Sequence, residues 1–246
     1  MQAIVLAGGY GTRLGALGET VPKALLALGG TTVIDMLLGR LARIGIAEAL
    51  LVTNARFHSA FEAWAGSGAH ALPVRLLCDG STAPENRLGA VRDLALGLEH
   101  VDAAEGVLVS SSDTVYDADL APVLERYRAV AAPVVALMLE EDEAVLARSG
   151  VAVPGADGRL MAFVEKPAKA PSPYAAPPLY VYPPDIRADI DAFLAAPGID
   201  HDAPGHLVAF LIARRPVYGV ILEGRGIDIG SQASYEAVRR RFENRP

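Results

Sequence analysis

The chain has 246 residues, and 52% of them are hydrophobic. It contains one cysteine, Cys78, and has a formal charge of −7. This composition excludes a disordered or fibrous protein and a disulfide framework within the chain. The negative charge gives no basic face for nucleic acid, and no run of lysine and arginine suggests one. Since no signal peptide precedes the first strand and no apolar run approaches the roughly 18 residues of a membrane span, we expect a cytoplasmic protein with no membrane partner.

The first predicted element is a buried strand that runs into a glycine-rich loop. Residues 3–7 are apolar and too few for a helix, which predicts a strand. Gly8, Gly9 and Gly11 follow at once. Without Cβ atoms, such a loop can approach a nucleotide closely and turn its backbone N–H groups toward an anion. The stretch therefore predicts a phosphate-binding loop.

Two positive charges, Arg13 and Lys23, follow this loop. The glycine-rich loop is not a P-loop, because a P-loop needs a Gly-Lys pair. It is not a dinucleotide fingerprint either, because Leu14 stands where the third glycine is needed. Residues 6–14 and 22–23 read Leu-Ala-Gly-Gly-Tyr-Gly-Thr-Arg-Leu and Pro-Lys, and they resemble the signature of the nucleotidylyltransferases that make sugar nucleotides. The resemblance implies that Arg13 and Lys23 meet the triphosphate and the leaving pyrophosphate. It also implies nucleotide contacts at Leu6, Ala7, Gly8, Gly9, Gly11 and Thr12.

Strands and helices alternate as far as residue 78. A capping box from Thr32 to Asp35 predicts the start of an amphipathic helix. Apolar runs at 49–53 and 74–78 predict two more strands, with a helix between them that faces the core. This alternation is typical of a parallel sheet. We expect an α/β fold, a Rossmann-like, mostly parallel mixed sheet flanked by helices, with a small β insertion on the sugar side.

A polar loop opens at Asp79, after the strand at 74–78, where α/β sheets place ligands. The next helix is expected to begin at residues 87–90, with Leu88 inward. In the family that the chain resembles, the backbone near Gly89 lies close to the base, so Asp79 and Gly89 are candidate nucleotide contacts. A packing role for Gly89 is an equally good interpretation.

Residues 106–111 form the strand expected at the centre of the sheet, and Asp113 follows it. A carboxylate at the carboxyl end of a parallel strand is well placed to hold a metal. The alternative is that Asp113 caps the following turn. The resemblance implies that Asp113 also contacts the nucleotide, although Ser112 stands where the family usually has glycine.

Asp157-Gly158 predicts a hairpin whose second strand ends in Glu165-Lys166-Pro167. This matches the family's Glu-Lys-Pro element, so the resemblance implies that Glu165 and Lys166 bind the sugar phosphate. A lysine at a strand end can also be merely solvated. Tyr180, in a strand predicted over 174–182, is the third candidate on the sugar side, although Pro178 replaces a glycine of the family.

Residues 225–230 match the family's Asp-Ile-Gly element and a closing helix follows at 231–242. Gly226 replaces an aromatic residue of the family there. The resemblance makes Asp228 the second carboxylate, beside Asp113, of a Mg²⁺ site. Mg²⁺ needs only one or two carboxylates when substrate phosphates complete its shell.

We interpret residues 1–246 as one nucleotidyltransferase domain, with a nucleotide-binding half (about 1–115) and a sugar-phosphate and metal half (about 116–246). The expected reaction joins a nucleoside triphosphate and a sugar 1-phosphate, and Arg13, Lys23, Asp113, Lys166 and Asp228 are its expected catalytic residues. Alternatives are a cytidylyltransferase acting on phosphocholine, inositol phosphate or a phosphonate, and a non-catalytic regulatory homologue. A molybdenum-cofactor guanylyltransferase would not need the Glu-Lys-Pro and Asp-Ile-Gly elements. The base, the sugar and any association into a homo-oligomer are left open by the sequence.

Overall fold

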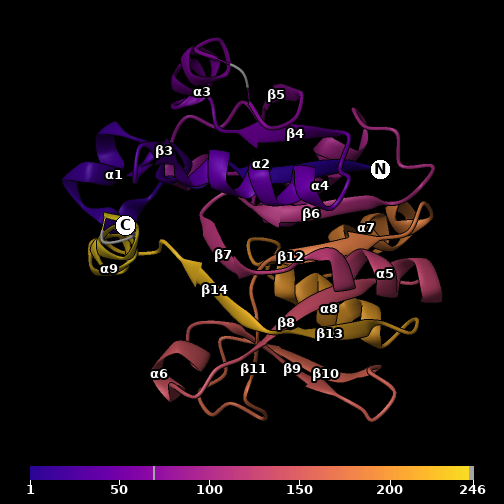
Figure 1. Ribbon diagram of the computed structural model, residues 1–246. Helices are drawn as coiled ribbons and strands as arrows, with labels where there is room; N and C mark the ends of the chain where they lie inside the picture. Colours follow the sequence, from indigo (N-terminus) through magenta and orange to yellow (C-terminus); the bar gives the residue numbers. More distant parts are fainter. Residues whose placement is uncertain (69, 244–246) are drawn as a thin grey trace.

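The computed structural model describes residues 1–68 and 70–243, and one mixed sheet runs through them. Its strands are β1 (Gln2–Ala7), β4 (Glu48–Thr53), β5 (Val74–Cys78), β6 (Val107–Ser111), β8 (Val134–Leu139), β9 (Gly150–Pro154), β10 (Leu160–Glu165), β11 (Tyr174–Ala176), β12 (Leu179–Tyr182) and β13 (Tyr218–Leu222). Their order is β10-β9-β11-β8-β12-β6-β1-β4-β5, with β13 beside β8 (Figure 1). β1 is parallel to β4 and β6, whereas β12 lies antiparallel between β6 and β8. The expected mixed α/β sheet is confirmed.

Helices cover both faces of the sheet. The helices α2 (Val33–Arg43), α3 (His58–Ala65) and α5 (Ala121–Val130) pack on one face, and α4 (Ala90–Leu98), α7 (Ile186–Ala195) and α8 (Pro204–Ile212) pack on the other. Along β1, Ala3 and Val5 join the first core and Ile4 joins the second, as the alternation of side chains in a strand requires. Every one of these three side chains is fully buried.

Two small ribbons lie outside the main sheet. One pairs β2 (Ala27–Leu28) with β3 (Thr31–Thr32), and the other pairs β7 (Thr114–Ala118) with β14 (Gly224–Asp228). The last helix, α9 (Gln232–Glu243), lies near the short helix α1 (Ala16–Thr20) in Figure 1, and the Tyr235 hydroxyl donates to the carbonyl oxygen of Ala27 at 2.8 Å. The end of the chain is therefore tied to the segment that follows the glycine-rich loop.

Most predicted elements are present, with three differences. The helix expected from residue 87 begins at Ala90, so Leu88 lies before it and is 36% exposed instead of inward. The strand expected over 174–182 is split into β11 and β12, because the Pro177-Pro178 pair cannot donate ladder hydrogen bonds. The strands β7 and β14 and the helix α7 were not predicted.

Two expected features near the ends of helices and strands are confirmed. Thr32 Oγ1 accepts from the backbone N–H of Asp35 at 3.2 Å, which caps α2. The β9–β10 hairpin turns at Gly158, whose φ is +80°. The short helix α6 (Glu143–Leu146) precedes this hairpin. Across the part of the chain that the structure describes, every helix is too short or too polar to span a bilayer.

Candidate active site

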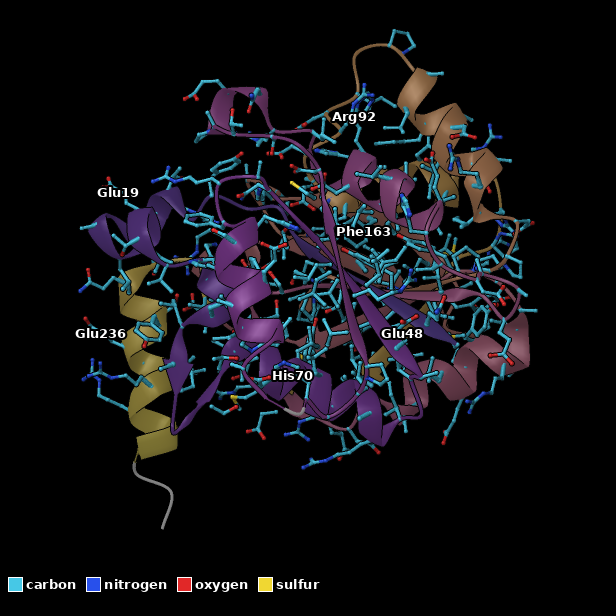
Figure 2. The ribbon with its side chains drawn as sticks, turned by 90° about the horizontal axis from the view of Figure 1, so that it is seen from above. Glu19, Glu48, His70, Arg92, Phe163 and Glu236 are labelled. Carbon is cyan, nitrogen blue, oxygen red and sulfur yellow. The ribbon has the colours of Figure 1, made fainter. Side chains whose placement is uncertain are left out.

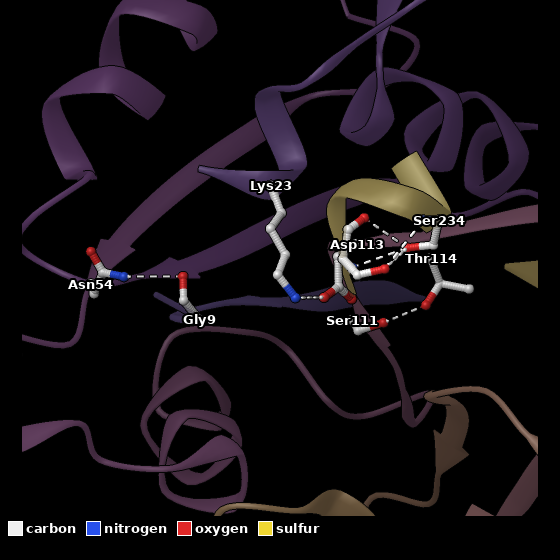
Figure 3. A network of polar contacts seen from close by, with 8 residues as sticks. Gly9, Lys23, Asn54, Ser111, Asp113, Thr114 and Ser234 are labelled. Carbon is white, nitrogen blue, oxygen red and sulfur yellow. Dashed lines mark hydrogen bonds and ion pairs between the residues drawn. The ribbon is translucent and has the colours of Figure 1, made fainter. Parts of the chain in front are cut away.

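The glycine-rich loop leaves the end of β1 and is held by a buried asparagine. The side-chain amide of Asn54, directly after β4, donates to the carbonyl oxygen of Gly8 at 3.1 Å. It also donates to the carbonyl oxygen of Gly9 at 3.5 Å (Figure 3). Because the C=O and N–H of one peptide point in opposite directions, the N–H groups that follow these carbonyls turn away from Asn54. Gly11 has φ of +64°, and a Cβ on Gly18 would lie 2.3 Å from the Gly11 oxygen. Gly11 and Gly18 are thus positions that require glycine, and the loop is held as a fixed backbone surface.

Lys23 and Asp113 form an ion pair beside the loop. Lys23 begins a 3₁₀ helix (Lys23–Leu25) directly after Pro22, and Asp113 occupies the turn between β6 and β7. Lys23 Nζ lies 3.1 Å from Asp113 Oδ2, and the side chains are 14% and 24% exposed (Figure 3). Both charges are therefore held in place but remain open to a ligand.

Asp228 joins this pair from the other end of the chain. The pairing of β14 with β7 sets Asp228 opposite Thr114, next to Asp113, and the Ile229 N–H donates to the Asp113 carbonyl at 2.9 Å. Desolvation and repulsion by the Asp113 carboxylate raise the pKa of Asp228 to about 6, against the opposing effect of Lys23 and Arg13. Because Asp228 is exposed as a whole residue, we attribute the raised pKa mainly to the nearby Asp113 charge.

A cavity of about 200 Å³ extends from the Lys23–Asp113 pair to the start of α4. It lies at the carboxyl ends of β1 and β6, the usual place for ligands in an open α/β sheet. Among the described residues, its wall includes the predicted positions Leu6, Ala7, Gly8, Gly9, Lys23, Gly89 and Asp113. The other predicted nucleotide contacts do not line it, namely Gly11, Thr12, Arg13 and Asp79.

Gly89 is tightly packed and also lines the cavity, so its predicted contact with the nucleotide stays a prediction. Its φ is +91°, and a Cβ would lie 3.0 Å from the carbonyl oxygen of His201, so close packing against residues 201–202 requires a glycine. The same residue lines the cavity. Figure 2 shows Arg92, one turn further into α4, beside the loop that precedes α8, with its Nη2 3.3 Å from Nδ1 of His201.

Arg13 stands at the rim of the site. Within the described ranges it makes no hydrogen bond or ion pair, but its guanidinium lies near Asp228. A Cβ built on Gly230 would be 3.6 Å from Arg13 Nη2 and 2.5 Å from Asp228 Oδ2. The arginine is therefore exposed and free to meet an anion.

Glu165 and Lys166 lie at the end of β10, outside the cavity wall. Lys166 has φ of +45°, a strained conformation for a residue with a side chain, and such strain is common at functional sites. Its Nζ is 3.7 Å from Glu165 Oε1, and the two side chains are 59% and 13% exposed. Burial raises the pKa of Glu165, and Lys166 opposes the shift. Glu165 packs against Gly205 of α8, and the neighbouring Pro204 lines the cavity. Lys166 therefore stands behind the part of the cavity wall that Pro204 forms.

Tyr180 is not placed to meet a sugar in this conformation. It is 2% exposed and stacks on Tyr182 with ring centroids 5.8 Å apart. Burial raises the pKa of its hydroxyl well above the ordinary value. The residue belongs to the core between β12 and α8, not to the cavity wall.

The three residues that depart from the family pattern, Ser112, Pro178 and Gly226, each make close contacts within the fold. Ser112 is buried, and its N–H donates to the Leu6 carbonyl at 3.0 Å, which ties the end of β6 to β1. Pro178 lines the cavity, and its carbonyl accepts from the Ser111 N–H at 3.0 Å. A Cβ on Gly226 would lie 3.0 Å from Pro177 Cγ, so the glycine leaves room for the Pro177-Pro178 turn.

Three residues near the cavity had no role assigned from the sequence. Asn54 could have been found as a polar residue directly after a strand. Asp93 and Asp202 both line the cavity. Asp93 lies among apolar residues of α4, and Asp202 comes from a loop 109 residues further along the chain, facing Arg87 at 2.8 Å. Asp202 lies outside every predicted motif, whereas Asp93 closes the segment 79–93, whose resemblance to short members of the family could have singled it out.

The fold and the site together define a class of protein. A mostly parallel sheet carries, at the carboxyl ends of its strands, a rigid glycine loop, a fixed lysine and two adjacent carboxylates. This arrangement suits an α/β domain that binds and orients phosphate groups.

Comparison with known proteins narrows this class. A family model described as nucleotidyl transferase matches residues 2–245. The glucose-1-phosphate thymidylyltransferase of Actinoplanes sp. is 30% identical, over 95% of this chain and 75% of the relative. The enzyme of that name from Mycobacterium tuberculosis is 29% identical over 76% of this chain, and the match spans only 62% of the relative's length. A UDP-glucose pyrophosphorylase solved with UDP-glucose shares the fold, with a TM-score of 0.83 at 19% identity and 100% coverage of both chains. The chain belongs to the nucleotidyl transferase family.

Proposed function

We propose that the protein transfers a nucleotidyl group from a nucleoside triphosphate to a sugar 1-phosphate and releases pyrophosphate. The observation that carries the proposal is the meeting of Lys23, Asp113 and Asp228 beside the glycine loop. These residues come from the beginning, middle and end of the chain; Lys23 and Asp113 line the cavity, and Asp228 stands beside Asp113 outside its wall. The names of the matched relatives, thymidylyltransferase and pyrophosphorylase, describe reactions of this class.

The residues suit an in-line displacement. An oxygen of the acceptor phosphate forms a bond to the α-phosphorus, and the bond from that phosphorus to the bridging oxygen of the β-phosphate breaks. No enzyme nucleophile takes part, so the protein acts by positioning two anions and neutralising charge. The glycine loop orients the triphosphate through its N–H groups, and Lys23 and Arg13 stabilise the leaving pyrophosphate. Lys166 holds the acceptor phosphate from the other side.

Asp113 and Asp228 fit a divalent cation such as Mg²⁺. Both supply hard oxygen donors, and their mutual repulsion, seen in the raised pKa of Asp228, is the strain that a cation would relieve. The described residues contain no group of three or more His, Cys, Asp or Glu side chains able to hold a metal. The pair therefore suits an ion whose remaining ligands are water and substrate phosphate. When bound, the ion would supply positive charge against the phosphate oxygens.

The test is a measurement of pyrophosphate release across a grid of substrates. The nucleotides are ATP, GTP, CTP, UTP and dTTP, and the acceptors are several sugar 1-phosphates together with phosphocholine and inositol phosphate. We expect release that depends on Mg²⁺ and on both substrates, with a sugar 1-phosphate as the best acceptor. Release only with a non-sugar acceptor would contradict the acceptor class, and no release with any pair would contradict the proposed reaction.

A further inference from the structure

The wall of the cavity beside Gly8 is acidic and contains a carboxylate without a partner. Asp93, in the first turn of α4, lines the cavity and is only 5% exposed. Its Oδ1 is buried and accepts no hydrogen bond among the described residues. Its Oδ2 lies so near the loop that a Cβ on Gly8 would be 2.6 Å from it. A buried carboxylate is normally paired or well hydrogen-bonded.

The neighbours of Asp93 do not neutralise it. Asp79 also approaches Gly8, where the same Cβ would lie 3.2 Å from Asp79 Oδ2, and this carboxylate already accepts from the N–H and hydroxyl of Ser81 at 2.6 and 2.9 Å. Asp202 is bound by Arg87 through two contacts of 3.0 and 2.8 Å. Burial, followed by repulsion from Asp79 and Asp202, raises the pKa of Asp93 to about 7. Across the described parts of the chain, no cationic side chain opposes this shift.

A purely structural role does not account for this arrangement. An acidic residue in the first turn of a helix gains only about 0.3–1 kcal/mol from the helix dipole. Burial without a partner opposes that gain, and an apolar side chain would fill the same place without the penalty. Asp93 instead resembles a binding group whose partner arrives with a ligand.

The position of Asp93 in the cavity identifies the part of the ligand that it meets. This step rests on the proposed function, in which the triphosphate lies on the glycine loop and Lys23. The nucleoside then extends toward α4, Gly89 and Asp93. An unpaired carboxylate accepts N–H donors and repels carbonyl oxygens. Guanine presents two adjacent donors, N1–H and N2–H₂, whereas thymine and uracil present one N–H between two carbonyl oxygens.

We propose that Asp93 reads the base of the nucleoside triphosphate and selects guanine over thymine and uracil. The guanine N1–H and N2–H₂ groups donate to the Asp93 carboxylate. A thymine or uracil in the same place would turn a carbonyl oxygen toward it. The preference thus differs from that named by the thymidylyltransferase relatives.

The experiment measures nucleotide binding by titration calorimetry at pH 8 with Mg²⁺ and no acceptor. The ligands are GTP, ITP, ATP, CTP, UTP and dTTP. ITP is the matched ligand, because its base lacks only the N2 amino group of guanine. We expect GTP to bind at least about a hundredfold more tightly than UTP or dTTP, and about ten- to a hundredfold more tightly than ITP, since one charge-assisted hydrogen bond is lost.

Asp93→Asn keeps the shape of the side chain and removes its charge. It should reduce the ratio of GTP to ITP affinity to near one and leave UTP binding unchanged or stronger. Asp119→Asn, at an exposed aspartate whose Oδ1 caps Ala121 N at 3.0 Å, is the matched control and should leave every ratio as in the wild type.

Three results would overturn the inference while leaving the proposed function in place. The first is that any other nucleotide binds the wild type more tightly than GTP does. The second is that the wild type binds GTP and ITP equally. The third is that Asp93→Asn lowers the affinity for all nucleotides by the same factor, which would place the carboxylate at the ribose. Binding of no nucleotide would instead refute the proposed function and the inference with it. The wild-type ratios decide the matter even if the variant does not fold.

Discussion

The unpaired Asp93 carboxylate should make the free protein less stable at alkaline pH, and Asp93→Asn should remove that loss. The ordinary pKa of the carboxyl is 3.8, and in the folded chain it is raised to about 7, first by burial and then by Asp79 and Asp202. Between these two values the unfolded chain binds fewer protons at this position than the folded chain. The free energy of unfolding therefore falls as the pH rises through this window, and it stays low above pH 7.

The size of the effect follows from the same two pKa values. The gap between 3.8 and about 7 corresponds to at most about 4 kcal/mol, at about 1.4 kcal/mol for each tenfold change. Local rearrangement and water entry reduce this figure, so we expect Asp93→Asn to be more stable than the wild type by roughly 1–4 kcal/mol at pH 8.5. At pH 5 the folded wild type keeps the proton, and the difference should shrink to less than about half.

The assay is denaturant unfolding of both proteins without nucleotide at several pH values between 5 and 8.5, compared as a difference in free energy of unfolding. Asp119→Asn controls for the loss of one negative charge at an exposed position, and it should shift stability by no more than about 0.5 kcal/mol at any pH. If the wild type and Asp93→Asn had the same stability throughout, or if the variant were the less stable at pH 8.5, the carboxylate would not be strained and the reasoning would be wrong.

Three further predictions concern the phosphate end of the site. Gly11→Val places a branched side chain at φ of +64°, and should abolish nucleotide binding in calorimetry; unchanged affinity in a folded variant would make the loop purely structural. Lys166→Ala should raise the KM for the acceptor about ten- to a hundredfold without weakening nucleotide binding, whereas Lys23→Ala should mainly lower kcat; equal damage to both substrates by Lys166→Ala would refute this division. Asp228→Ala should lower kcat at least about a hundredfold at saturating Mg²⁺, and near-normal turnover would remove it from the metal site.

The sequence predicted the parts of the fold and site that depend on local patterns. The strand before Gly8, the Thr32 cap and the Gly158 hairpin each follow from a few adjacent residues, and each is present. The prediction that Leu88 faces inward was wrong. The helical spacing of apolar residues continues before α4, but the positive φ of Gly89 makes the helix begin only at Ala90. For Tyr180, a strand was predicted but the burial of the side chain was not. That burial depends on α8, which comes from a later part of the chain and packs on the same face of the sheet.

Of the three aspartates near the acidic wall of the cavity, Asp79 was predicted as a nucleotide contact, whereas Asp93 and Asp202 were not predicted, for a different reason. Asp79, Asp93 and Asp202 lie after β5, within α4 and before α8, and they approach one another only because α4 and α8 cover the same face of the sheet. Each aspartate alone has an ordinary explanation as a turn, helix-start or surface residue. Only the burial of Asp93, whose carboxylate is left unpaired beside the other two, distinguishes them.

On the proposed function, we expect the opposite charges of Lys23 and Asp93 to set the direction in which a nucleotide binds. Lys23 lines the cavity beside Asp113, while Asp93 lines the wall beside Gly8 and has no cationic partner among the described residues. A triphosphate turned toward Asp93 would meet a buried negative charge and would leave Lys23 unused, so repulsion excludes the reversed orientation as strongly as attraction favours the correct one. If Asp93 reads the base as proposed, the same unpaired carboxylate that lowers the stability of the free protein would also reject the wrong orientation and the wrong base.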